Sequence, residues 1–203
     1  MYSLYHYPYS QHSRRVVSLL EEAGLDYEIK HLAMDRGAHM APEYLAVNPN
    51  HQVPTLIAGE IKIHESNAIL RYLCFKHDLH DWYPTDPAAR ALVEQWLDWN
   101  QCRLSPVVID IVLNTVFMGE NGDQAAAQRG REALPELASV LEAGLEERTY
   151  LAGGAPSIAD LSVVSNIFHL SFAEARPASH NISAWFEHMS GLQGFQKSLP
   201  QAA

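Results

Sequence analysis

The residues that could do chemistry begin with a serine in a short loop near the start of the chain. Ser10 lies in the segment YPYSQHSRRV, which follows a predicted strand and begins a predicted helix. Backbone N–H groups and the positive end of the helix dipole converge at such a point and favour an anion. Helix capping by Ser10 or Ser13 is the alternative. A Ser–His hydrolase is disfavoured, because the sequence has no G-x-S-x-G motif and His12 is poorly placed on a tight loop to act as base.

Two further segments could hold the ends of a small peptide. Pro54 stands directly before a predicted strand, where a cis peptide bond would turn the N–H and C=O of Val53 outward to pair with an extended ligand. A trans proline at a strand entry is the more common case. Later in the chain, Ser66 at a helix start could bind a carboxylate while Glu65 pairs with an ammonium group. Ordinary N-capping by Ser66 is the alternative.

The elements that position these residues follow a β-α-β-loop-β-β-α order. Alternating apolar runs and turn signals predict strands at residues 3–7, 27–32, 54–57 and 61–64, and helices at residues 13–23 and 66–76. This is the order of a thioredoxin-like domain, in which the strand and helix ends that carry the three candidate segments meet at one edge of the sheet. We therefore expect the three segments to converge there.

The second part of the chain is predicted to be helical throughout. Residues 81–87 form a linker between a domain of residues 1–80 and an all-helical domain of residues 88–203. Ser157 and Asp160 form an S-x-x-D capping box before a predicted buried helix. The expected fold class is an α+β thioredoxin-like N-terminal domain followed by an all-α helical-bundle domain.

Composition restricts the classes of partner. The 203 residues include 14 Lys and Arg against 24 Asp and Glu, and the net charge of −10 argues against nucleic acid or an anionic membrane as partner. No stretch approaches the roughly 20 apolar residues of a membrane span. Cys74 and Cys102 form no C-x-x-C pair, which disfavours a disulfide framework or a cysteine zinc site and indicates a reducing, cytoplasmic setting. Both cysteines fall within predicted helices and are interpreted as packing residues.

With these motifs in this order, the chain resembles a cytosolic glutathione transferase over essentially its whole length. The segments that carry the resemblance are Asn48-Pro49-x-x-x-Val53-Pro54, Glu65-Ser66-x-Ala68-Ile69 and the Ser157–Asp160 box. Among the subclasses it is most similar to the theta-like, serine-type enzymes, because Ser10-Gln11-x-x-Arg14-x-Val16 repeats their serine loop.

The resemblance implies a role for each matched residue. Ser10 is the expected thiol-activating hydroxyl, and Tyr5 or Tyr7 is the alternative, because they lie near the position that tyrosine-type relatives use. Gln52 departs from the lysine that theta-like enzymes often carry. The remaining implied contacts to glutathione are His39 at its glycine end, Gln52, Val53 and Pro54 along its backbone, and Glu65 and Ser66 at its γ-glutamyl end.

The implied activity is attack of the glutathione thiolate on a small hydrophobic electrophile. Glutathione serves as co-substrate and no metal is expected, and the implied assembly is a cytoplasmic homodimer without nucleic-acid or membrane partners. A noncatalytic binding or interaction module and a glutathione-dependent isomerase or dehalogenase are the alternatives. The candidates for the wall of a second pocket are Tyr7, Tyr9, Trp99, Val107 and Ile111.

Overall fold

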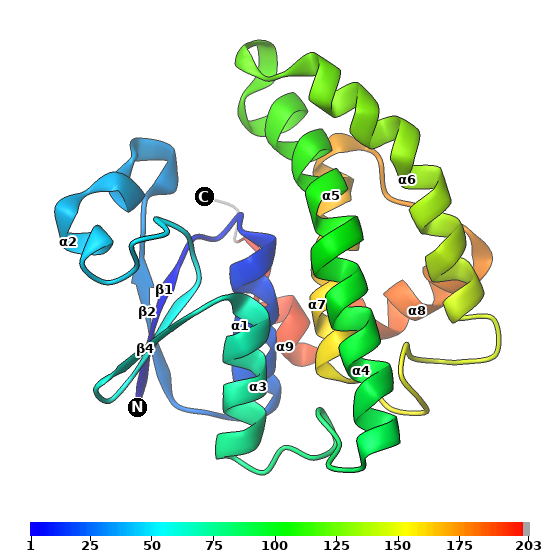
Figure 1. Cartoon of the computed structure of the whole chain (residues 1–203), viewed down its shortest axis with the longest axis horizontal. Coiled ribbons are helices and arrows are strands. Elements are labelled where there is room, and N and C mark those ends of the chain that lie inside the picture. Colours follow the sequence, from blue (N-terminus) through cyan, green and yellow to red (C-terminus); the bar gives the residue numbers. More distant parts are fainter. Residues whose placement is uncertain (201–203) are drawn as a thin grey trace. The chain divides into compact units, whose positions relative to one another are not determined.

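The computed structural model describes residues 1–200 and divides into two compact units (Figure 1). The first unit comprises Met1–Leu79 together with residues 191–200, and the second comprises His80–Ser190. The division between Leu79 and His80 lies next to the expected linker. The end of the chain differs from the expectation, because residues 191–200 pack within the first unit and not within the helical one.

A mixed four-stranded sheet organises the first unit, with strand order β2-β1-β3-β4. Strand β1 (Tyr2–His6) runs parallel to β2 (Tyr27–His31), antiparallel β3 (Thr55–Ala58) lies on its other side, and β4 (Ile61–His64) completes the sheet. Helix α1 (Gln11–Glu22) connects the two parallel strands, which is the crossover that parallel pairing requires. The predicted β-α-β-β order is thus observed.

The two faces of the sheet are covered by different elements. Leu4 and its partner Leu56 are fully buried on the face where α1 and α3 (Ser66–Lys76) pack. The next residue, Tyr5, points to the opposite face because side chains alternate along a strand. There it packs with Leu32 and Tyr44, in a cluster near the short helices η1 (Met34–Arg36), η2 (Ala38–Met40) and α2 (Pro42–Leu45) (Figure 1).

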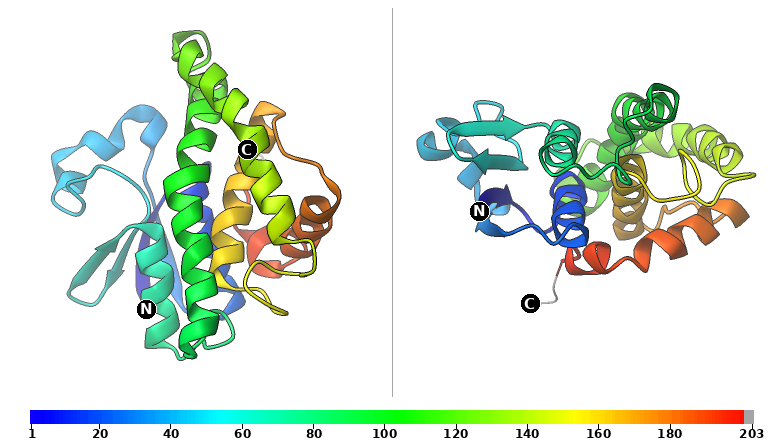
Figure 2. Two further views of the ribbon diagram at one scale, coloured as in Figure 1. Left: turned by 45° about the vertical axis from the view of Figure 1, so that its right-hand side comes forward. Right: turned by 90° about the horizontal axis from the view of Figure 1, so that it is seen from below.

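Apart from an isolated β-bridge between Tyr150 and Gly153, the described secondary structure of the second unit is helical. A continuous helical run consists of α4 (Pro87–Trp99), η3 (Asn100–Leu104), α5 (Ser105–Val112) and η4 (Leu113–Phe117). The η3 and η4 turns are π-helical, and η3 ends two residues before Pro106, where a regular α-helix would meet a missing N–H group. After η5 (Gly119–Asn121), helix α6 (Gln124–Gly144) runs back along α5 (Figure 2).

Helix α7 (Ile158–His169) is the core of the second unit, and all of its residues except Phe168 are buried. The predicted capping box is present at its start, where the Asp160 carboxylate accepts hydrogen bonds from the backbone N and Oγ of Ser157. The same carboxylate accepts from the Leu151 amide and from Trp185 Nε1, which lies on α8 (His180–Ser190). Burial raises the pKa of Asp160, whereas these four donors favour its ionised form. One carboxylate thus joins three segments of this unit.

The short helices η6 (Leu170–Ala173) and α9 (Gln193–Lys197) complete the described elements. No helix in the described part of the chain is both long and apolar enough to cross a membrane.

Candidate active site

The sheet register brings the three candidate segments to one edge of the first unit. Tyr5 in β1 pairs with Thr55 in β3, and Thr55 pairs in turn with His64 in β4. The Ser10 loop leaves β1 just beyond this row, Val53 and Pro54 enter β3 just before it, and Glu65 follows His64 directly. Since the row crosses the sheet, all three segments lie at the same end, as expected from the sequence.

Ser10 occupies the N-cap of α1. The chain reaches it through a turn in which the Ser10 amide donates to the Tyr7 carbonyl at 3.0 Å, with Pro8 at the second turn position, where its fixed φ fits. The Ser13 amide then donates to Ser10 Oγ at 3.2 Å, and the Arg14 amide donates to the Ser10 carbonyl at 3.0 Å. Of the two serines that could cap the helix, Ser10 does so.

Capping leaves Ser10 able to serve a ligand. In the contact with the Ser13 amide, Oγ is the acceptor, so the hydroxyl hydrogen is not used and can be donated. The N–H groups of the first helical turn have no carbonyl partners within the helix and contribute partial positive charge at the same point. The geometry suits a hydrogen bond to an anion, so the capping and functional interpretations of Ser10 are compatible.

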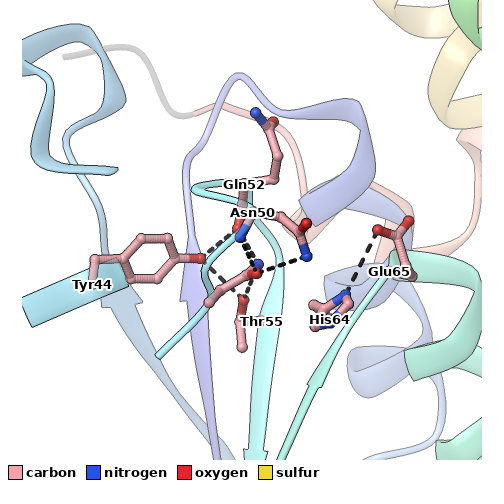
Figure 3. A network of polar contacts seen from close by, with 7 residues as sticks. Tyr44, Asn50, Gln52, Thr55, His64 and Glu65 are labelled. Carbon is pink, nitrogen blue, oxygen red and sulfur yellow. Dashed lines mark hydrogen bonds and ion pairs between the residues drawn. The ribbon is translucent and has the colours of Figure 1, made fainter. Parts of the chain in front are cut away.

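The Val53–Pro54 peptide bond is cis, as one interpretation of the sequence required. A buried polar network holds the preceding residues: Asn48 Nδ2 donates to the Gln52 carbonyl and to Thr55 Oγ1, both at 3.0 Å, and Tyr44 Oη also donates to the Gln52 carbonyl (Figure 3). The Val53 side chain is buried against Tyr44. The backbone at positions 52–54 is therefore fixed from both sides.

Sequence reasoning assigned no role to the side chains of Asn48, Tyr44 and Thr55, which hold this network together. Asn48 is almost completely buried, and its Oδ1 accepts from the backbone amide of Asn50 at 3.0 Å, which is an Asx turn. The available signal was an asparagine directly before a proline, which is typical of turns. Its partners Tyr44 and Thr55 could not be foreseen, because they come from a short helix and a strand on either side.

Glu65 has a left-handed backbone, with φ 67° and ψ 108°. A non-glycine residue in such a conformation costs about 1–3 kcal/mol and is characteristic of functional sites. Its side chain is 68% exposed, and Oε1 lies 3.7 Å from His64 Nδ1 (Figure 3). The carboxylate therefore faces solvent at the sheet edge, where a ligand could reach it.

Ser66 is the first residue of α3 and not its cap. Glu65 occupies the N-cap position and makes no side-chain cap hydrogen bond, so the interpretation of Ser66 as an ordinary N-cap is wrong. Ser66 is nearly buried at the helix N-terminus, beside the exposed Glu65 carboxylate. A hydroxyl and a carboxylate are thus adjacent at a helix start, which is the arrangement that could bind an ammonium and a carboxylate together.

His39 reaches the same edge through a residue that sequence reasoning did not single out. His39 lies in η2, and its ring centroid is 6.3 Å from that of His51. His51 Nδ1 is in turn 3.5 Å from Gln52 Nε2. The His51 ring therefore lies beside both His39 and Gln52, which are far apart in the sequence.

Tyr5 and Tyr7 have mainly packing contacts. Both pack against the cluster of Leu32, Tyr44 and Val53, and the rings of Tyr5 and Tyr44 are 5.2 Å apart. Burial, with Asp35 nearby, raises the pKa of Tyr7, which opposes formation of a tyrosinate. Tyr9, at 5.8 Å from the Tyr7 ring, is more exposed.

The three candidate pocket residues of the helical unit differ in their burial. Trp99 is partly buried with its ring 5.1 Å from that of Trp96, and Val107 is also partly buried. Ile111 has no exposed surface and therefore lines no open pocket in this structure. Its Cγ1 would lie 2.9 Å from a Cβ at Gly130, so it belongs to the tight packing of α5 on α6. Sequence reasoning missed two exposed apolar side chains on η4, which continues α5; they are Leu113 and Phe117.

The two cysteines differ from each other. Cys74 is buried, and burial raises the pKa of its thiol to about 12, which agrees with a packing role. Cys102 is exposed, so its interpretation as a packing residue is wrong. Within residues 1–200, no group of three or more His, Cys, Asp or Glu side chains is placed to hold a metal ion.

Two family models match this chain. The model of the glutathione S-transferase N-terminal domain matches residues 1–74, and that of the glutathione S-transferase C-terminal domain matches residues 104–193. The chain belongs to the glutathione S-transferase family. The fold class expected from the sequence, a thioredoxin-like domain followed by a helical domain, is confirmed.

Similar glutathione S-transferases come from plants and bacteria. Probable glutathione S-transferase GSTF2 of Oryza sativa subsp. japonica is 33% identical over 193 residues, which cover 90% of this chain and 88% of that protein. Glutathione S-transferase 4 of Zea mays is 35% identical over 189 residues, covering 90% of this chain and 85% of that protein. The theta class enzyme of Xanthomonas axonopodis pv. citri, solved with glutathione bound, superposes with a TM-score of 0.89 at 29% identity, covering 99% of this chain and 98% of that one.

Proposed function

We propose that this glutathione S-transferase activates its co-substrate through Ser10, whose hydroxyl donates a hydrogen bond to the thiolate of bound glutathione. The observation that carries the proposal is the N-cap geometry of Ser10 at the sheet edge, with Oγ accepting from the Ser13 amide. In this role the serine is a donor, and the sulfur of the tripeptide is the nucleophile.

The magnitudes are sufficient for this role. A thiol with a pKa of about 8.5 is only a few per cent ionised at pH 7. Lowering that pKa by about two units requires about 2.7 kcal/mol. A hydrogen bond to a charged group contributes about 1.5–3 kcal/mol, and a helix N-terminus adds about 0.3–1 kcal/mol. Ser10 and the first turn of α1 together can supply the difference.

The other segments bind the tripeptide in this proposal. Val53, held between Gln52 and Pro54, pairs its backbone with that of glutathione, and the rigid network around Asn48 supports this contact. Glu65 pairs with the γ-glutamyl ammonium and Ser66 with its carboxylate, which explains why a strained backbone persists at position 65. His39, together with His51 beside it, faces the glycine end.

The thiolate then attacks a small hydrophobic electrophile, and the proposed chemistry calls on no metal. Tyr7, Tyr9, Trp99 and Val107 are the proposed contacts of that second substrate. We further propose a homodimer in the cytoplasm. The Xanthomonas relative with glutathione bound supports glutathione as the co-substrate.

Replacing Ser10 by alanine tests the assignment. Loss of one hydrogen bond to a charged sulfur costs about 1.5–3 kcal/mol, so kcat/KM for conjugation to an aromatic halide should fall about 10- to 150-fold. Glutathione affinity, measured by calorimetry, should remain close to that of the parent.

Ser13→Ala is the matched control. Ser13 lies on the same helical turn, and its buried Oγ has no hydrogen-bond partner among residues 1–200. Only its backbone amide contacts Ser10, so this variant should keep parental activity. Full activity in Ser10→Ala would exclude the assignment. A parent that binds glutathione without conjugating any halide would favour the noncatalytic alternative, and product analysis would identify isomerisation or dehalogenation.

A further inference from the structure

The helix that carries Ser10 is held at its other end by the C-terminal segment of the chain. Helix α9 packs against the second half of α1 (Figures 1 and 2). The Gly194 amide donates to the Glu22 carboxylate, and Lys197 Nζ donates to Glu21 Oε2 at 2.7 Å. In addition, the buried hydroxyl of Ser18 donates to that of Ser198 at 3.1 Å. We call residues 191–200 the C-terminal brace.

Gly194 is the point of closest approach in the C-terminal brace. A Cβ atom at this position would lie 2.3 Å from the Ser18 carbonyl oxygen and 3.1 Å from the Glu22 amide nitrogen, whereas ordinary contact begins at 3.4 Å. The obstructing atoms are mainly α1 backbone, so no side-chain rotation relieves the overlap. Any larger residue must therefore move α1 and α9 apart by about 1 Å.

Glu21 extends the same linkage to the sheet. Its carboxylate accepts from Lys197 on α9 and also from Tyr27 Oη in β2 at 2.7 Å. The lysine, which is the main cause, and the tyrosine together lower the pKa of Glu21, so it stays ionised near neutral pH. The C-terminal end of α1 is thereby tied to both its neighbouring strand and the brace.

We propose that the C-terminal brace sets the position of α1 along the sheet and that Gly194 is a positioning residue for Ser10. Ser18 lies eight residues after Ser10, which is about 12 Å along a helix. A helix that is packed on its neighbours moves as a body, so a displacement at Ser18 reaches Ser10 with little loss. This inference rests on the proposed function of Ser10 and adds to it the element that positions the serine.

Gly194→Ala tests the proposal. A misplacement of about 1 Å at a reacting group can lower the rate about 100-fold, so kcat should fall by 10- to 100-fold. The pKa of the bound glutathione thiol should rise toward its value in solution. The KM for glutathione should change less than threefold, because the proposed binding residues lie on η2, in the loop before β3 and at the start of α3, and not on α1.

The control is Gly153→Ala, where a Cβ would meet nothing within 4 Å. This variant should keep the parental kcat and thiol pKa. Thermal unfolding of both variants separates a loss of folded protein, which lowers the active fraction, from a true change in the thiol pKa. Gly194→Ala with parental kcat and parental thiol pKa would overturn the proposal.

A second variant covers the case in which Gly194→Ala does not fold. Glu22→Ala combined with Lys197→Met removes both carboxylate contacts of the brace without adding volume against α1. It should also raise the thiol pKa and lower kcat, by a smaller factor of about 3 to 10. Parental values in this variant would contradict the proposal. If Ser10→Ala itself leaves the thiol pKa unchanged, the proposed function of Ser10 fails. If Ser10→Ala raises the thiol pKa but the brace variants keep the parental kcat and thiol pKa, only the positioning role of the brace fails.

Discussion

Replacement of Asn48 by alanine should weaken both the fold and glutathione binding. The side chain is almost fully buried and donates to the Gln52 carbonyl and to Thr55 Oγ1, while accepting from the Asn50 amide. At about 1 kcal/mol for each buried hydrogen bond, the loss in unfolding free energy is about 3 kcal/mol. The Gln52 carbonyl keeps its bond from Tyr44, so the loop loosens without losing all of its anchors.

The functional consequence follows from the place of this network directly before Val53. A looser loop must be ordered when the tripeptide binds, and we expect the glutathione Kd to rise about tenfold, which corresponds to about 1.4 kcal/mol. Urea unfolding and calorimetric titration measure the two effects. Asn50 is exposed, and Asn50→Ala removes one partly buried side-chain contact at 3.2 Å, so it should change the unfolding free energy by less than about 0.5 kcal/mol. If Asn48→Ala stays within about 1 kcal/mol of the parent, the network does not hold the loop as argued.

Two other perturbations give distinct signatures. Glu65→Gly suits the left-handed backbone at this position, so unfolding free energy should stay within about 1 kcal/mol of the parent while glutathione affinity falls at least about tenfold; parental affinity in calorimetry would exclude the ammonium contact. Burial, followed by His31 and Arg14, lowers the pKa of His6 from 6.5 to about 4. Between pH 6.5 and 4 the unfolded chain therefore binds a proton at His6, whereas the folded chain keeps His6 neutral. The contribution of His6 to the unfolding free energy is complete above a pH of about 6.5. It falls by up to about 3 kcal/mol as the pH drops toward 4. Urea unfolding at several pH values should show a shallower loss in His6→Gln, and identical slopes for parent and variant would refute this account of His6.

Much of the fold and the place of the site followed from local patterns in the sequence. The β-α-β-β-α order could be predicted because strand alternation and turn residues are local signals, and the order alone brings the ends of β1, β3 and β4 together. The S-x-x-D box at Ser157 and Asp160 is equally local and is present. Its links to Leu151 and Trp185 depend on tertiary packing and left no local signal.

The remaining errors share one physical cause, which is that burial depends on partners distant in the chain. The pattern around Cys102 is helical, but it does not show which side of the helix is covered, and this cysteine is exposed. Ile111 was predicted to line a pocket, but α6 packs closely on it at Gly130 and leaves it no exposed surface. Residues 193–197 form a helix as expected, yet the segment 191–200 packs with α1. Only the close approach of Gly194 to Ser18 shows why a glycine stands there.

The central claim is that the Ser10 hydroxyl stabilises the sulfur anion of bound glutathione. The most direct test is an ultraviolet titration of the thiolate in the complexes of the parent, Ser10→Ala and Ser13→Ala with glutathione. The parent and Ser13→Ala should show a thiol pKa about two units below the value of about 8.5 for an ordinary thiol, and Ser10→Ala should raise it by about one to two units, the equivalent of one charged hydrogen bond. An identical titration curve in all three complexes would contradict the account and direct attention to Tyr5 or Tyr7.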